Sequence, residues 1–149
     1  MIMSVTKIAG FTTPLITEYI DGVNWKVHEP FTFYFYHKDG KILCEYEDGC
    51  EKQYITSNVG DTTDFASIPK WLHSIWSPTG DHGKAAVIHD KIYRTPALIN
   101  EATGKSFTKE DADLLFLIGM EILGVSWFKR EAFYYAVKFG GNKAWESNR

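Results

Sequence analysis

The chain has 149 residues, 44% of them apolar and 23% charged, with a formal net charge of −3 at pH 7. This length and composition suit one globular domain over residues 1–149, with a core large enough to fold without disulfides or metals. The negative balance argues against a nucleic-acid-binding protein, which normally shows a basic patch or stripe. No apolar run approaches the roughly 20 residues that span a bilayer, and residues 1–11 lack the apolar stretch of a signal peptide.

The first half of the sequence has the pattern of strands joined by tight turns. Asp-Gly pairs at 21–22, 39–40 and 48–49 separate runs of β-forming residues, and glycine accepts the positive φ that such turns need. Phenylalanine alternates with threonine or tyrosine over 31–36, which is the period-2 pattern of a strand. We therefore predict an antiparallel β meander within residues 1–57. Its expected strands are 16–20, 23–29, 31–36, 42–46 and 53–57.

Residues 58–82 are expected to connect the strands to a helical part. Ser67 can cap a short helix that tolerates Pro69 in its first turn, and the sequence Ser-Pro-Thr-Gly at 77–80 ends it. We interpret its apolar stripe as core, although the stripe could also shape a groove beside a site. The stripe consists of Trp71, Leu72, Ile75 and Trp76.

The two cysteines, Cys44 and Cys50, flank one of the predicted turns. A disulfide between them is one alternative, but we expect two free thiols, as in a cytosolic protein. No Cys/His spacing matches a zinc-binding pattern.

The helical part, residues 83–149, follows from apolar residues that recur at the spacing of a helix. Thr108 and Asp111 resemble a capping box, with Asp in place of the usual Glu or Gln, and Gly124 suits a helix C-terminus. The chain is therefore predicted to be α+β, with the meander followed by three or four helices that include an antiparallel pair. The expected helices cover 84–94, 108–123 and 127–139, and 143–149 is expected to fray.

The sequence KAAVIHDKIYR carries the strongest candidate chemistry. His89 and Tyr93 lie four residues apart and share one helix face, whereas Asp90 points about 100° away. Asp113 is the carboxylate on the apolar side of the second predicted helix, and antiparallel packing would bring it to His89. A buried carboxylate on one imidazole nitrogen fixes the tautomer and leaves the other nitrogen as a base. Asp90 would then be available to bind a hard cation.

Other polar residues have weaker claims. Asp64 is either a turn residue bonded to local amides or a second carboxylate or metal ligand beside the histidine, and Asp61 is a weaker case of the same kind. His73 is expected on the surface or half-buried. His82 is expected in a solvated loop, with a role at a metal site as the alternative. Ser67 lies outside any Gly-x-Ser-x-Gly pattern, which argues against a serine nucleophile.

The segments HDKIY and ADLLF resemble the helix pair of secreted and parvovirus-type phospholipases A2. By that resemblance, His89 would activate the attacking water and Asp90 would hold Ca²⁺. Asp113 and Tyr93 would orient the imidazole, and calcium would polarise the ester carbonyl. The disulfide framework of those enzymes is missing here, and SPTG is the one counterpart of their glycine-rich calcium loop.

A longer resemblance covers roughly residues 55–140. The motifs TDFASIPKWL, SPTG, AAVIHDKIY and DADLLF together resemble a family of small bacteriophage and prophage proteins of unassigned function. This resemblance implies a phage origin and a task in or against a bacterium. The protein would then act in the cytoplasm of the host during infection, or travel in the virion.

Two functional hypotheses remain open. The first is a phage-encoded hydrolase that uses a His89–Asp113 dyad on an ester or amide of a lipid or cell-envelope substrate. The second is a non-enzymatic protein, either a virion or tail component or an inhibitor that binds a host factor. In the second case the His-Asp-Tyr cluster is a buried network that fixes helix packing. The exposure of the cluster distinguishes the two hypotheses. A catalytic dyad needs an open cleft that substrate can reach, whereas a structural network is sealed.

Overall fold

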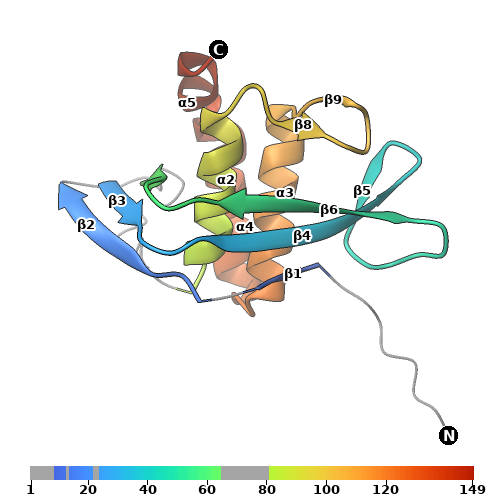
Figure 1. The fold of residues 1–149 in the computed structure, drawn as a ribbon, viewed down its shortest axis with the longest axis horizontal. Helices are drawn as coiled ribbons and strands as arrows, with labels where there is room; N and C mark the ends of the chain where they lie inside the picture. Colours follow the sequence, from blue (N-terminus) through green and yellow to red (C-terminus); the bar gives the residue numbers. More distant parts are fainter. Residues whose placement is uncertain (1–8, 13, 22–23, 65–80) are drawn as a thin grey trace, which may run out of the picture.

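The computed structural model describes residues 9–12, 14–21, 24–64 and 81–149. Short antiparallel strands fill the first half of the chain, and helices α2 to α5 follow (Figure 1). The predicted α+β class is thereby confirmed. The short helix predicted around Trp71 lies outside the described residues.

The central sheet is built around one long strand, β4 (Phe31–Lys38). One edge of β4 pairs with β6 (Glu51–Ser57). The other edge pairs with two short strands in tandem, β1 (Gly10–Phe11) and β5 (Lys41–Leu43). All of these pairings are antiparallel, as predicted.

The strand order differs from the predicted meander in one respect. β6 returns to pair with β4 rather than with β5, in a register that runs from Phe31 opposite Ser57 to His37 opposite Glu51. Because β1 and β5 already occupy one edge of β4, the returning strand takes the other edge. This register also places the buried Ile55 opposite Phe33, on the face that packs into the core.

A second small sheet holds β2 (Thr17–Asp21), β3 (Asn24–Val27) and β7 (Thr62–Thr63). The first two strands are the hairpin predicted around the first Asp-Gly pair. β7 falls in the segment expected to be a connection, and it pairs with Trp25 and Lys26 of β3. The buried Thr63 at its end faces the helices rather than solvent.

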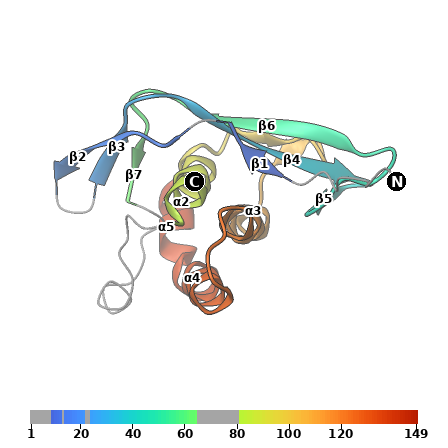
Figure 2. The same cartoon turned by 90° about the horizontal axis from the view of Figure 1, so that it is seen from below.

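The helices lie on one side of the central sheet in two layers. α2 (Gly83–Arg94) and α3 (Lys109–Ile122) pack against the sheet, and α4 (Trp127–Gly140) covers them on the far side (Figure 2). α2 and α3 run antiparallel, as predicted. α5 (Asn142–Ser147) packs beside α2. No helix among the described residues is long and apolar enough to cross a membrane.

Both predicted ends of the second helix are confirmed. The Thr108 hydroxyl accepts from Asp111 N at 3.1 Å, and the Asp111 carboxylate accepts from Thr108 N at 3.0 Å. At the other end Gly124 has φ +76°, and Val125 N donates to Met120 O at 3.0 Å. A left-handed glycine followed by this bond is a Schellman cap.

Two segments are more ordered than the sequence predicted. The segment between the predicted helices 84–94 and 108–123, for which no strand was expected, contains a hairpin, β8 (Ile99–Asn100) with β9 (Lys105–Ser106). Gln53 holds it to the sheet through hydrogen bonds to its backbone. The tail expected to fray forms α5, because the Trp145 ring packs edge-on against Tyr93 at 5.1 Å. Cys44 and Cys50 are free thiols, as expected.

The close approach of α2 and α3 depends on Gly119. A Cβ at this position would lie 2.9 Å from Ala85 Cβ and 3.3 Å from Phe11 Cζ. Gly119→Ala should therefore lower the free energy of unfolding by about 1–3 kcal/mol through overpacking, measured by urea denaturation. Gly140→Ala is the matched control, because nothing lies within 4 Å of a Cβ there. Equal stability of the two variants would contradict this account of the helix contact.

Candidate functional site

His89 and Asp113 meet at the centre of the α2–α3 interface. The distance from His89 Nε2 to Asp113 Oδ1 is 2.8 Å, and the Tyr93 hydroxyl donates to the same oxygen at 2.7 Å. The four-residue spacing of His89 and Tyr93 puts both side chains on the face of α2 that meets α3. The geometry predicted for these three residues is therefore present in the structure.

Lys109 completes this cluster, and the sequence analysis missed it. Its Nζ donates to Asp113 Oδ2 at 2.7 Å and to the backbone oxygens of Val137 and Lys138 at 2.9 and 3.0 Å. The lysine thus joins the start of α3 to the last turn of α4, where a cation is favoured by the helix dipole. Its position four residues before Asp113 was the available signal, since side chains at that spacing meet.

Asp90 points to the second sheet. Its Oδ2 accepts from the Thr63 hydroxyl at 2.5 Å and from Asp64 N at 3.0 Å, and its Oδ1 lies 3.7 Å from His89 Nδ1. The imidazole of His89 therefore lies between two carboxylates, one on each nitrogen side. The contribution of Thr63 had no signal in the sequence, because it depends on where β7 pairs.

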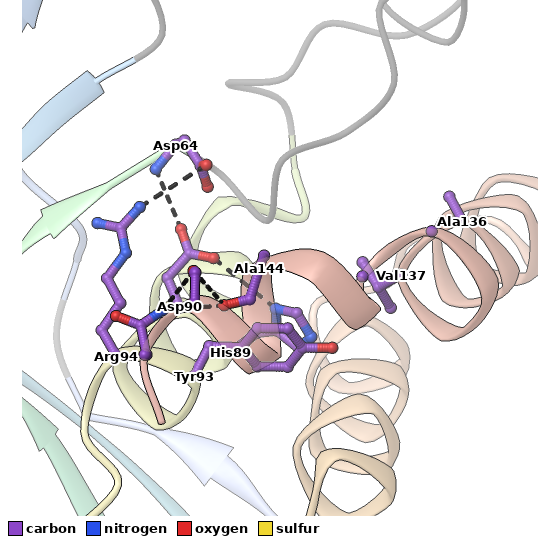
Figure 3. Close-up of a pocket in the computed structure, with 12 residues that line it drawn as sticks. Asp64, His89, Asp90, Tyr93, Arg94, Ala136, Val137 and Ala144 are labelled. Atoms are coloured by element: carbon purple, nitrogen blue, oxygen red, sulfur yellow. Dashed lines mark hydrogen bonds and ion pairs between the residues drawn. The ribbon is translucent and has the colours of Figure 1, made fainter.

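A pocket of about 310 Å³ opens beside this cluster. Figure 3 shows His89 and Asp90 on one side of it, with Ala144 of α5 and Val137 of α4 around them. The wall is formed by α2, by the last turns of α4, by α5 with the residue on either side of it, and by Asp64 just after β7. The lining residues are Asp64, His89, Asp90, Tyr93, Arg94, Ala136, Val137, Gly140, Gly141, Ala144, Ser147 and Asn148.

The Nδ1 atom of His89 is the distinctive group in the pocket. It is buried and has no hydrogen-bond partner among the described residues, while Nε2 is held by Asp113. The whole His89 side chain is only 2% exposed. A buried polar atom without a partner is costly, so such an atom marks a place where a ligand or water would be stabilised.

The electrostatics of the cluster favour a protonated histidine and ionised aspartates. Burial by itself lowers the pKa of His89, but Asp113 and Asp90 outweigh it, so that this pKa is raised. Burial raises the carboxyl pKa of both aspartates, yet the donors around them outweigh it and each pKa is lowered. Burial and the nearby Asp113 raise the pKa of Tyr93, which keeps its hydroxyl protonated as a donor.

Asp64 lines the pocket, as the prediction of a second carboxylate beside the histidine required. Its backbone nitrogen donates to Asp90, and its carboxylate lies 3.7 Å from Arg94 Nη2. Arg94 is itself held by Thr62, whose backbone oxygen accepts from Nη1 at 2.6 Å. The Asp64 carboxylate therefore lies close to the candidate site, and its role as a turn residue stays a prediction.

The other candidates lie elsewhere. Asp61 pairs with Lys91 Nζ at 2.9 Å, so it does not join His89. The expectation for His82 was wrong, because the side chain is fully buried and its ring packs 4.4 Å from that of Phe133. Position 82 directly precedes α2, and the packing of α4 over that end encloses it. His73 and Ser67 lie outside the described residues.

Among the described residues, no three His, Cys, Asp or Glu side chains gather in a group that could hold a metal ion. The Oδ2 atom of Asp90 is already engaged by Thr63 and Asp64 N. Calcium takes six to eight oxygen ligands, which is more than these described side chains supply, and the calcium role stays a prediction. The proposed role of Asp90 as a metal ligand thus lacks the neighbours it would need within the part of the chain described.

The fold and site together define an α+β protein with a buried His–Asp dyad beside a pocket. A comparison with protein families shows that the chain belongs to a family of unknown function, DUF1353, whose profile matches residues 42–137. The match runs from within β5 to Val137 in α4, and so includes every side chain of the dyad cluster. No curated protein and no solved structure matches the chain significantly.

Removal of the Lys109 ammonium should destabilise the fold. Lys109→Met leaves the buried Asp113 carboxylate and the α4 carbonyls without their cation, so the free energy of unfolding should fall by about 3 kcal/mol in chemical denaturation. Lys105→Met is the control, because Lys105 is exposed and should change stability by less than about 0.5 kcal/mol. A loss no larger than that of the control would show that Lys109 does not stabilise the cluster.

The raised pKa of His89 sets the sign of a pH effect on stability. The unfolded chain loses its proton near pH 6.5, whereas the folded protein keeps it to higher pH. The stability that His89 contributes is therefore fully present below that pH, and it is lost as pH rises through the folded pKa at about 1.4 kcal/mol per unit. Denaturation of wild type and His89→Gln between about pH 6 and pH 9 should show a difference that shrinks with rising pH. A constant difference would contradict the raised pKa.

Proposed function

We propose that the protein is a hydrolase in which His89 acts as general base on a water in the pocket. The observation that carries this proposal is the difference between the two ring nitrogens of His89. Nε2 is fixed by Asp113, while Nδ1 makes no hydrogen bond among the described residues, lies 3.7 Å from Asp90 Oδ1 and belongs to a side chain that lines the pocket. A carboxylate-oriented imidazole with one nitrogen toward substrate is the arrangement of general-base catalysis.

The proposed reaction is hydrolysis of an ester or amide. Nδ1 takes a proton from water as the water oxygen attacks the carbonyl carbon, and Asp113 stabilises the imidazolium that results. Nδ1 then returns the proton to the leaving oxygen or nitrogen as the tetrahedral intermediate collapses. The raised pKa of His89 makes it a stronger base, and the reaction should run faster above that pKa, where the imidazole is neutral.

A lipid or cell-envelope molecule is the substrate class that suits the walls of the pocket. The sides away from His89 are formed by small apolar groups, Ala136, Val137 and Ala144. An acyl chain or another apolar group could lie against them while its carbonyl faces the imidazole. The resemblance to phospholipases A2 supports the same class. We also propose a phage origin, with action in the infected host or from the virion.

Calcium is a separate part of the proposal. The phospholipase resemblance gives Asp90 the role of calcium ligand, and the described side chains around it supply fewer oxygen ligands than that ion takes. The proposed proton transfers use only residues of the chain, and no step depends on the metal. Assays with added Ca²⁺ and with a chelator will show whether calcium contributes.

A non-enzymatic role is the second candidate, and burial favours it. His89, Asp113 and Asp90 are at most 5% exposed, as a structural network would be. On this hypothesis the cluster fixes the packing of α2 against α3 and β7. The partner would be a phage structural protein or a host factor, and the protein would have no hydrolytic activity.

The His89→Gln variant separates the two functions. Glutamine can still donate a hydrogen bond to Asp113 but cannot accept a proton, so hydrolysis should be abolished while the fold survives. The assay measures fatty-acid release from phosphatidylcholine–phosphatidylglycerol micelles and cleavage of p-nitrophenyl butyrate. Lys105→Met is the activity control, since it lies on an exposed strand away from the pocket.

Two outcomes would reject the hydrolase. One is turnover in His89→Gln equal to that of wild type, in a variant whose melting temperature shows that it is folded. The other is a wild-type protein with no activity on either substrate, combined with a loss of stability of a few kcal/mol in His89→Ala. The second result would support the structural network.

A further inference from the structure

α4 carries a row of exposed aromatic side chains. Phe128 and Phe139 are 75% and 71% exposed, and Tyr135 between them is 49% exposed. The spacings of seven and four residues put all three on one face of the helix. Trp127, 61% exposed, flanks this row. We call these four residues the aromatic face. Exposed large apolar side chains in a contiguous patch mark a surface that binds something.

The fold makes this face point outward. The opposite side of α4 is fixed to the core by Phe133 and Val137, both buried. α4 is also the layer farthest from the central sheet, with α2 and α3 between them (Figure 2). The aromatic rings are ordered against each other, since those of Tyr135 and Phe139 stack at 5.9 Å. The aromatic face is therefore part of a helix that is packed on the core.

A basic side chain borders the aromatic face, although the chain as a whole is negative and Lys129 of the same helix is paired with Asp81. Lys138 Nζ lies 5.6–5.8 Å from the rings of Tyr134, Tyr135 and Phe139, so it borders the face. The region from α4 to the end of the sequence contains more basic than acidic residues. The basic ones are Lys129, Arg130, Lys138, Lys143 and Arg149, and the acidic ones are Glu131 and Glu146.

The aromatic face is continuous with the wall of the pocket. Ala136 and Gly140 each follow a residue of the face by one position, and both line the pocket beside His89. One step along a helix is a rotation of about 100°, so the pocket lies on the adjoining side of the same helix. A surface bound by the face would lie next to the pocket.

We propose that the aromatic face docks the protein on an anionic lipid bilayer. A helix with Trp, Phe and Tyr on one side and lysine at the border matches the chemistry of interfacial membrane binding. Phe128 and Phe139 enter the headgroup region, and the basic side chains attract anionic headgroups. The proposal deepens the proposed function, on which it rests for the meaning of the pocket, because it delivers that pocket to a lipid substrate.

A second copy of the chain is a less suitable occupant. A symmetric dimer through α4 would gather the basic side chains of both copies in one interface, where they outnumber Glu131 of the same helix. Like charges facing each other in an interface cost free energy. An anionic bilayer instead neutralises them and covers the aromatic rings at the same time.

Vesicle sedimentation tests the proposal. The wild-type chain should bind vesicles of phosphatidylcholine with phosphatidylglycerol more strongly than vesicles of phosphatidylcholine alone, and salt should weaken the binding. Phe128→Ser/Phe139→Ser should reduce the partition coefficient by about tenfold or more. Tyr19→Ser/Tyr54→Ser is the matched control, since it removes two aromatics that are 55% and 58% exposed on strands. That double variant should bind as wild type does, and melting curves confirm that both are folded.

Three results would overturn the docking proposal. The first is no binding of wild type to anionic vesicles, and the second is an equal loss of vesicle binding in the two double variants. The third is a dimer in sedimentation velocity that Phe128→Ser/Phe139→Ser abolishes, together with no vesicle binding. The His89→Gln variant keeps this test separate from the proposed function. Vesicle binding by this variant at the wild-type level, with no hydrolysis by the wild type, would support docking and reject the hydrolase. Hydrolysis of p-nitrophenyl butyrate by the wild type without vesicle binding would support the hydrolase and reject docking.

Discussion

The carboxylate of Asp113 is the group that the arrangement of the helices depends on. One oxygen accepts from His89 and Tyr93 of α2, and the other accepts from Lys109 of its own helix. A buried carboxylate without these donors would cost several kcal/mol, so the helices are stable only in the register that supplies them. The contact of Gly119 with α2 sets the distance between the helix axes that this register needs.

Asp90 is a second buried carboxylate, and its hydrogen bonds connect α2 to the second sheet. Its bonds to Thr63 and to Asp64 N hold the short strand β7 against α2, and its other oxygen faces His89. The imidazole is thus oriented from both sides by groups that come from three parts of the chain. The pocket begins where this polar cluster meets the small apolar side chains of α4 and α5.

Sequence periodicity predicted the dyad because helical spacing decides which side chains share a face. Once the second helix was expected to run antiparallel, Asp113 was the carboxylate that could reach His89. Lys109 was missed although its spacing was readable, since its main partners are backbone oxygens of α4. Thr63 and the folding of α5 on Tyr93 depend on contacts between residues far apart in sequence, which local patterns do not encode. The return of β6 to β4 has the same cause.

Lys109 also has a consequence for the chemistry of the pocket. Its ammonium is shared between Asp113 and the final carbonyl groups of α4, so a displacement of that last turn alters how much positive charge the carboxylate receives. Less charge on that side leaves Asp113 more basic toward the imidazole. The proton affinity of His89 is therefore governed in part by the position of α4, a helix that contributes no ionisable side chain to the cavity.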